Sequence, residues 1–269
     1  MRVGIVGTGE MGRPLVVRLR SASFDVAAWA RRPEIRAQLE DAGVPCVNDV
    51  GALARGRDVV IVYVYSDEQV RNVLLEGGLA DAMEPGSVIV VQTTASPRTI
   101  EAIAERVVPR NIEVVDAPGS GGPAQVANGT LTLFVGGDAE AVARCTPLFS
   151  AYASQVVHFG PPGSGQKVKL LNNLLFGAQV ELAVEAAELC DSLGVDPQLV
   201  AKTLHTCSGA SYALDLVATM GTAEALLDAA GRFVFKDVVT ALAAADDAGA
   251  RLGALGLVSD AVMNRTRSD

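Results

Sequence analysis

The chain of 269 residues is 49% hydrophobic and carries 31 acidic against 22 basic residues, which gives a formal net charge of −9 at pH 7. This acidic balance argues against a broad surface for nucleic acid or anionic membrane and favours chemistry on a small molecule. The length and the apolar content are sufficient to bury a large core, in two domains or in one large domain.

Cysteine and targeting patterns limit the remaining classes. The four cysteines form no CxxC pair and the two histidines have no ligand spacing with them, so we expect no metal site. No uncharged apolar run reaches the roughly 20 residues that span a bilayer, and the first residues lack the pattern of a signal peptide. We therefore expect a cytoplasmic protein with reduced thiols and with neither a membrane nor a nucleic-acid partner.

A glycine-rich turn follows the first apolar segment of the chain. Arg2 to Val6 is a short β-branched run that predicts a buried parallel strand, and a helix is expected afterwards, through Arg20. Between them stands the hexapeptide Gly7-Thr8-Gly9-Glu10-Met11-Gly12, which has the GxGxxG order of a dinucleotide-binding turn. Such glycines permit close backbone approach, and the helix N-terminus offers amide groups to a pyrophosphate. We predict dinucleotide binding here; the alternative is a purely structural glycine turn.

The end of the second predicted strand, Asp25 to Trp29, indicates which dinucleotide is bound. An acidic residue about 20 positions beyond the glycines would bind the 2′-hydroxyl of an NAD ribose. Arg31 and Arg32 stand there instead, with no acidic residue beside them at the strand end. Guanidinium groups match the geometry of a phosphate, so NADP is predicted in preference to NAD. The alternative is that both arginines are simply solvated in a loop.

Apolar strands and helices alternate as far as about His158, which predicts a doubly wound parallel sheet of the Rossmann type, covered by helices on both faces. In such sheets the ligand crevice lies at the carboxyl ends of the strands. Val64-Tyr65 and Thr93-Thr94 follow two of the predicted strands and should lie at that crevice. The run Pro161-Pro162-Gly163 ends the α/β part, so we expect an NADP-binding domain over residues 1–161.

A second glycine-rich loop follows the strand predicted at Glu113 to Asp116. It contains Gly119, Ser120, Gly121 and Gly122 between two prolines. Such a loop can direct backbone N–H groups and one hydroxyl at an anion. Glycine and proline are equally ordinary in a plain turn, and the residues alone leave both possibilities open.

One long helix is predicted over residues 163–194, and the segments after it are also helical, which gives an all-helical substrate and oligomerisation domain over residues 162–269. Lys169 and Asn173 are four residues apart, so they share one face of this helix and can reach one small ligand. A lysine on an otherwise apolar helix face is a suitable proton donor. The alternative is an ordinary solvated lysine.

Four motifs together resemble the β-hydroxyacid dehydrogenase family, which contains 3-hydroxyisobutyrate dehydrogenase, tartronate semialdehyde reductase and 6-phosphogluconate dehydrogenase. They are the glycine hexapeptide, the segment Asp116 to Gly122, the stretch Gly163-x-Gly165-x-x-x-Lys169-x-x-Asn172-Asn173 and the pair Lys236-Asp237. They occur in the family's order and span most of the chain. The resemblance implies an NADP-dependent enzyme that transfers a hydride between NADPH and the carbonyl or hydroxyl group of a small anionic acid, of the 3-hydroxyacid or semialdehyde type.

The same resemblance implies roles for residues around the substrate. Lys169 would be the general acid in reduction and the general base in oxidation, and Asn173 would hold the substrate oxygen. Ser120 would act with these two as a catalytic residue. Together with Gly121 and Gly122, it would bind the carboxylate or other anionic group of the substrate.

Further roles concern the cofactor and the assembly. Val64, Tyr65 and Thr94 would line the cofactor, and Lys236 would approach it from the helical domain. Members of the family are usually dimers or tetramers, so we expect a homodimer or homotetramer formed through the helical domain.

Two other functions remain open from the sequence. Imine reductases look like close relatives with the same glycine turn, but they generally lack the catalytic lysine, so Lys169 argues against that reading. The second is a non-catalytic NADP-binding module that serves protein interaction. It would need neither Lys169 nor Asn173.

Overall fold

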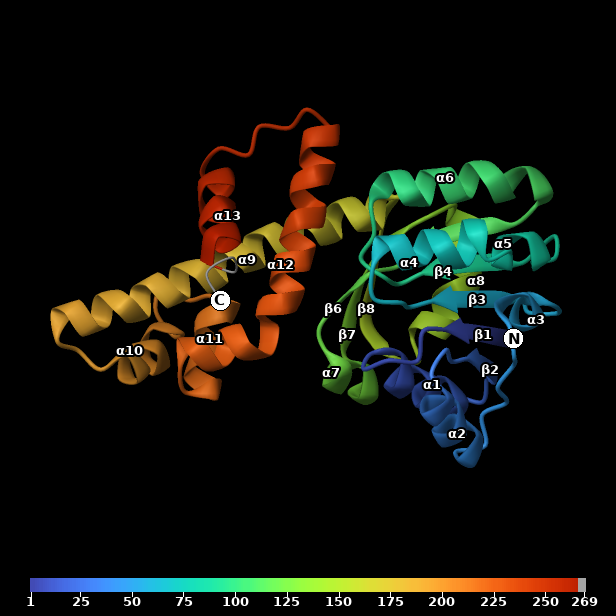
Figure 1. The fold of residues 1–269 in the computed structure, drawn as a ribbon, viewed down its shortest axis with the longest axis horizontal. Coiled ribbons are helices and arrows are strands. Elements are labelled where there is room, and N and C mark those ends of the chain that lie inside the picture. Colours follow the sequence, from blue (N-terminus) through green and yellow to red (C-terminus); the bar gives the residue numbers. More distant parts are fainter. Residues whose placement is uncertain (266–269) are drawn as a thin grey trace. The chain divides into compact units, whose positions relative to one another are not determined.

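The computed structural model describes residues 1–265, and it divides into two compact units at the boundary between Lys169 and Leu170. The first unit, coloured from blue through green to yellow, is a sheet with helices packed around it, and the second unit is entirely helical (Figure 1). None of the described helices is both long enough and apolar enough to cross a membrane.

The first unit is built on an eight-stranded sheet in the order β2-β1-β3-β4-β5-β7-β6, with β8 beside β7. Its strands are β1 (Arg2–Val6), β2 (Asp25–Trp29), β3 (Val59–Val62), β4 (Val88–Val91), β5 (Glu113–Asp116), β6 (Gly119–Ser120), β7 (Leu131–Gly136) and β8 (Ala153–Gly160). The strands from β2 to β5 are parallel, and their last residues are paired across the sheet: Trp29, Val6, Val62, Val91 and Asp116. Because these ends are in register, the loops that follow them meet at one edge.

The parallel strands are buried on both faces, which explains their continuous apolar sequences. In β3, for example, Val59 and Ile61 pack on one face with helices α1, α2 and α8, whereas Val60 and Val62 pack on the other with α3 to α6. The helices of this unit are α1 (Gly12–Ser21), α2 (Pro33–Asp41), α3 (Val50–Ala54), α4 (Asp67–Arg71), α5 (Leu79–Ala82), α6 (Pro97–Val107), α7 (Pro123–Asn128) and α8 (Ala139–Phe149), with a π-helical turn at Asn72–Glu76 and a 3-10 turn at Val108–Arg110. The predicted doubly wound fold is confirmed.

The far edge of the sheet departs from the parallel pattern. Strand β7 runs antiparallel to β5, through Asp116 and Gly136, and antiparallel to β6, whereas β8 is parallel to β7. The Ser-Gly-Gly segment therefore begins as a short strand, since Gly119 and Ser120 pair with Leu133 and Thr132.

The second unit continues the long helix α9 (Ser164–Leu193) and adds α10 (Pro197–Leu204), α11 (Tyr212–Met220), α12 (Ala223–Asp247) and α13 (Ala254–Arg265). Its core contains residues of α9, such as Leu174 and Val184, packed with residues of α12, such as Val234 and Val238. An ion pair adds to this packing, because Arg265 of α13 donates to the buried carboxylate of Glu181 at 2.8 Å.

Candidate active site

The glycine hexapeptide forms the turn between β1 and α1, and two of its glycines are required by their surroundings. Gly7 has a φ of 95°, and a Cβ there would overlap the carbonyl oxygen of Tyr63. A Cβ on Gly12 would overlap the carbonyl oxygen of Gly7, so only glycine lets α1 begin this close to the turn. Gly9 is different, since a Cβ there would meet nothing within 4 Å. Its backbone therefore borders open space in front of the N-terminus of α1, which suits the approach of a pyrophosphate.

Arg31 and Arg32 lie at the carboxyl end of β2, beside the glycine turn, because Trp29 at the end of β2 pairs with Val6 at the end of β1. Both arginines are exposed. Arg32 precedes α2, and its Nε lies 3.7 Å from a carboxylate oxygen of Glu34, in a pair whose side chains are 60% and 61% exposed. An ion pair this long and this exposed holds Arg32 only weakly.

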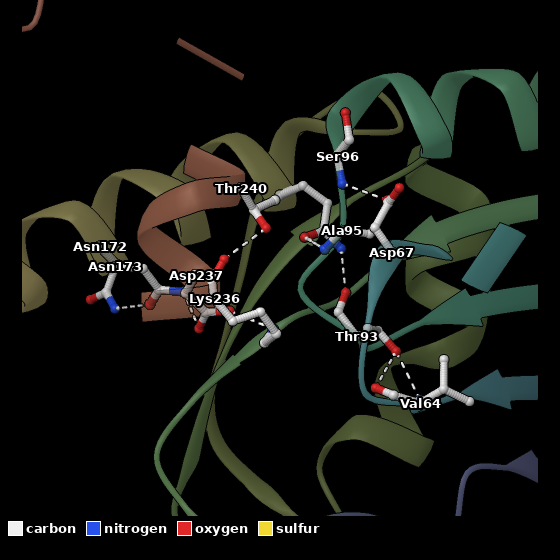
Figure 2. A network of polar contacts seen from close by, with 11 residues as sticks. Val64, Asp67, Thr93, Ala95, Ser96, Asn172, Asn173, Lys236, Asp237 and Thr240 are labelled. Carbon is white, nitrogen blue, oxygen red and sulfur yellow. Dashed lines mark hydrogen bonds and ion pairs between the residues drawn. The ribbon is translucent and has the colours of Figure 1, made fainter. Parts of the chain in front are cut away.

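The loops after β3 and β4 are joined by Thr93, which the sequence placed at the crevice without a role of its own (Figure 2). Its hydroxyl accepts a hydrogen bond from the backbone N–H of Val64 at 2.9 Å and lies 3.0 Å from the carbonyl oxygen of Val64. Val64 is half-buried, as is Thr94, and the side chain of Tyr65 is exposed. The structure thus brings Val64 next to the segment that contains Thr94, at the carboxyl edge of the sheet.

Asp116 ends β5 and is fully buried at the start of α9. One carboxylate oxygen accepts the backbone N–H of Gly163 and the other accepts that of Gln166, each at 2.7 Å. Burial raises the pKa of this carboxyl, and the hydrogen bonds from backbone N–H groups oppose that rise. A Cβ on Gly165 would overlap the carbonyl oxygen of Phe134, so the helix can start here only with glycine at that position. Asp116 thereby fixes the first turn of α9 to the strand end that leads into the Ser-Gly-Gly loop.

The Ser-Gly-Gly loop itself has fewer available donors than its sequence suggests. Gly121 adopts a φ of 126°, a conformation that favours glycine. The backbone N–H of Gly122 is already bonded to the side-chain oxygen of Gln125 at 2.9 Å, and Pro123, which begins α7, has no N–H. The half-buried hydroxyl of Ser120 and the backbone N–H of Gly121 are the donors in this loop for which no such partner is seen among residues 1–265.

Lys169 and Asn173 are one turn apart on α9, in its second and third turns, as the sequence predicted. Lys169 is half-buried and is the last residue of the first unit, whereas Asn173 is buried and belongs to the second unit. A buried amide needs hydrogen-bond partners, and the partners of Asn173 come from its own unit.

In the second unit, Asp237 joins two of the predicted site residues (Figure 2). One of its carboxylate oxygens accepts from Nδ2 of Asn173 at 2.8 Å, and the other accepts from Nζ of Lys236 at 2.6 Å. The side-chain oxygen of Asn173 also accepts from Nδ2 of Asn172, at 3.2 Å. The orientation of the Asn173 amide is therefore set by Asp237. The Lys236-Asp237 pair was visible in the sequence, but its bond to Asn173 was not.

Within residues 1–265, no three side chains of histidine, cysteine, aspartate or glutamate gather in a way that could hold a metal ion. The groups at the carboxyl edge are backbone amides, hydroxyls, amide side chains and cations, and the carboxylates of Asp116 and Asp67 there already accept hydrogen bonds from backbone N–H groups. This set suits the binding of a phosphate-containing cofactor and an anionic organic substrate.

The doubly wound sheet, the glycine turn before α1 and the long helix with its lysine define a dinucleotide-binding oxidoreductase. Residues 2–160 match the model of the NAD-binding domain of 6-phosphogluconate dehydrogenase, and residues 163–268 match that of the NAD-binding domain of NADP-dependent 3-hydroxyisobutyrate dehydrogenase. The chain belongs to the β-hydroxyacid dehydrogenase family, as its motifs predicted, and is an NAD(P)-dependent oxidoreductase that acts on CH–OH groups.

Characterised proteins are among its relatives. The chain is 35% identical to an L-threonate dehydrogenase of Cupriavidus necator over 78% of this chain and 71% of that protein. It is 30% identical to an NAD-dependent L-serine dehydrogenase of Pseudomonas aeruginosa, over 92% of this chain and 85% of that protein. Its fold matches that of Mycobacterium tuberculosis 3-hydroxyisobutyrate dehydrogenase solved with L-serine, with a TM-score of 0.89, 24% identity, and coverage of 99% of this chain and 94% of that one. Solved imine reductases also share the fold.

Proposed function

We propose that the protein is an NADP-dependent oxidoreductase that transfers a hydride between NADPH and the carbonyl or hydroxyl group of a small anionic acid, with Lys169 as general acid and base. One observation carries the proposal. The first turn of α9 is hydrogen-bonded both to Asp116, which begins the Ser-Gly-Gly loop, and to the segment around Thr94. The helix of Lys169 is thus anchored to both loops that the reaction would use.

The residues at the glycine turn fit a dinucleotide. Gly9 leaves open space at the N-terminus of α1, and the first turn of that helix contains no acidic residue to repel a pyrophosphate. Arg31 and Arg32 favour NADP, since their guanidinium groups can bind a 2′-phosphate that a carboxylate would repel. The cofactor supplies the hydride, and the residues of this chain supply position and charge.

The chemistry assigned to the chain is a proton transfer. Reduction of a carbonyl leaves negative charge on its oxygen, and Nζ of Lys169 donates a proton to that oxygen; in oxidation, the neutral amine removes the proton. General acid catalysis of this kind is typically worth about 10²–10⁴-fold in rate. Asn173, oriented by Asp237, donates a second hydrogen bond to the same oxygen through the remaining N–H of its amide.

The substrate class follows from the loop that begins with Gly119. The Ser120 hydroxyl and the Gly121 amide bind a carboxylate or a comparable anion, and the ammonium group of Lys169 attracts it. The C. necator and P. aeruginosa relatives are named for the hydroxy acids threonate and serine. We therefore assign a short 3-hydroxy acid, or the corresponding oxo acid, as the substrate class.

The proposal is tested by following NADPH oxidation with a panel of small aldehyde and keto acids, phosphonates and cyclic imines. Turnover of a carbonyl acid is the expected result. Turnover of imines alone would identify an imine reductase, and tight NADPH binding without any turnover would identify a binding module. In oxidation, 3-hydroxy acids such as L-threonate and L-serine should reduce NADP⁺ faster than their amide derivatives, because the amides lack the anion.

A further inference from the structure

Gln166 lies in the first turn of α9, three residues before Lys169, and its side chain is completely buried. Both ends of its amide are used. The oxygen accepts the backbone N–H of Ala95 at 2.9 Å, and the nitrogen donates to the carbonyl oxygen of Thr93 at 2.9 Å. These two backbone groups stand on either side of Thr94, so one side chain holds the peptide segment in which Thr94 lies.

Hydrogen bonds link Gln166 to further segments of the site. Thr93, whose carbonyl binds Gln166, also accepts the backbone N–H of Val64 through its hydroxyl, which links the loop after β3 to the loop after β4. On the other side, the backbone N–H of Gln166 is bonded to Asp116. Gln166 is thus the residue at which the two loops of the proposed cofactor site, the strand end before the anion loop, and the helix of Lys169 meet.

Holding α9 in place does not by itself require this side chain. Asp116 already fixes the start of the helix through two backbone N–H groups, and Gly165 lets the helix pack directly against Phe134. The amide of Gln166 adds contacts only to the segment around Thr94. Its burial is also costly unless both ends are paired, since a buried polar group without a partner loses its hydrogen bonds to water.

We propose that Gln166 is a positioning residue, which fixes the Thr94 segment of the cofactor site at a set distance from the ammonium group of Lys169. This inference rests on the proposed function. A hydride donor and a proton donor must be placed together on one carbonyl group, and a displacement of about 1 Å can cost about 100-fold in rate.

The informative variant is Gln166→Glu, which keeps the length of the side chain. An ionised glutamate still accepts from Ala95, but it places a negative oxygen against the carbonyl of Thr93. A protonated glutamate restores both bonds, because its O–H donates to that carbonyl, and burial favours the protonated form. Gln166→Met has a similar size and can make neither bond at any pH.

The titratable groups on the elements around position 166 are Asp116, the Lys167–Glu101 ion pair, Lys169, and Asp67, which accepts from the backbone N–H of Ser96. All of them are present in the wild type as well. The ratio of variant to wild-type activity therefore isolates the titration of the introduced glutamate from theirs.

The experiment measures kcat per NADPH-binding site, with sites counted by fluorescence titration, from about pH 5 to 9. We expect Gln166→Glu to lose about 10–100-fold at high pH, with a larger kinetic isotope effect from deuterated NADPH and little change in the KM for NADPH. Its ratio to wild type should rise as the pH falls, whereas that of Gln166→Met should stay low throughout. Gln198→Glu, which adds the same charge to the exposed start of α10, should match the wild type.

Counting binding sites removes the effect of misfolded protein, and Gln166→Asn, whose amide is too short to reach both groups, replaces any variant that does not fold. A kcat per site equal to wild type in Gln166→Met or Gln166→Asn would overturn the inference. The same ratio to wild type for Gln166→Glu and Gln166→Met at every pH would do so too, since only a protonated glutamate can restore the bond to Thr93. If the wild type itself fails to turn over, or if Lys169→Ala is as active as the wild type, the proposed function has failed instead.

Discussion

The preference for NADP can be tested through Arg31 and Arg32, which lie exposed at the carboxyl end of β2. Replacing both with alanine should weaken NADPH binding much more than NADH binding, because only NADPH carries the 2′-phosphate. A hydrogen bond to a charged group contributes about 1.5–3 kcal/mol, which corresponds to about 10–150-fold in Kd for each arginine.

The contribution of Arg32 to NADPH binding is reduced by its ion pair with Glu34. The two side chains lie 3.7 Å apart and are about 60% exposed, and Arg32 must weaken this contact in order to bind a phosphate. Such a pair contributes at most about 1 kcal/mol, so the loss does not cancel the gain. Glu34→Gln should therefore tighten NADPH slightly and leave NADH unchanged. For Arg31→Ala/Arg32→Ala, we expect the Kd for NADPH to rise by about 100-fold or more relative to the Kd for NADH at low salt.

The assay is fluorescence titration of NADPH and NADH with each variant. Arg55→Ala is the matched control, because Arg55 is also an exposed arginine but precedes β3, at the opposite edge of the sheet. It should leave both affinities unchanged. Equal losses for NADPH and NADH in the double variant would refute the assignment of these arginines to the 2′-phosphate.

The remaining predictions concern the glycine turn and the edge of the sheet. Gly12→Ala should abolish NADPH binding, since its methyl group would overlap the carbonyl of Gly7. Gly9→Ala should have the same unfolding temperature as the wild type but should bind NADPH poorly, because its methyl group occupies only the space that a cofactor needs. Wild-type affinity in Gly9→Ala would contradict this use of the turn. Hydrogen bonds from the Arg2 guanidinium, at 2.8 Å, and from the Arg2 backbone N–H lower the pKa of Asp58. A depressed native pKa stabilises the fold above the unfolded value of about 3.9, and this stability is lost as the pH falls through the lower native value. Because the pair is partly exposed, Asp58→Asn should lower the free energy of unfolding only slightly at pH 7, and this cost should shrink as the pH falls through the native pKa of Asp58. An equal cost at neutral and acidic pH would show that the charge is not the cause.

The α/β part of the fold could be predicted because its information is local. Each parallel strand is a short apolar run, and each is followed by a turn and a helix of the expected kind. The same reasoning missed the antiparallel course of β7, which depends on pairing with distant strands. The sequence pattern around Pro45 indicates a short strand, but the structure forms only a single bridge there, between Ala28 and Cys46.

The helical unit was harder to predict from its sequence. The sequence pattern predicts a last helix from Val234 to Gly249. In the structure, α12 begins earlier, at Ala223, where the side chain of Thr222 caps it, and a further helix, α13, follows. Five leucines of α9 are exposed in the single chain: Leu171, Leu175, Leu182, Leu189 and Leu193. The homodimer or homotetramer expected from the family stays a prediction, and these leucines are consistent with it.

Motif residues of the candidate site were visible in the sequence, but the residues that orient them were not. Gln166 and Thr93 are ordinary polar residues in sequence terms, and their partners lie far along the chain. Only the fold shows that Asp116 binds the start of α9 and that Asp237 binds Asn173. Buried polar groups of this kind are specified by three-dimensional pairing, which no local pattern reveals.

The role of Lys169 is tested most directly by comparing Lys169→Ala with Lys167→Ala. Lys167 lies on the same helix, but its side chain is 62% exposed and lies 3.5 Å from Glu101. We expect Lys169→Ala to bind NADPH as the wild type does, to lose about 10²–10⁴-fold in kcat, and to regain part of it when a small primary amine is added. Lys167→Ala should retain full activity. Wild-type turnover in Lys169→Ala, or equal losses in the two variants, would contradict the proposed function of Lys169 as the proton donor.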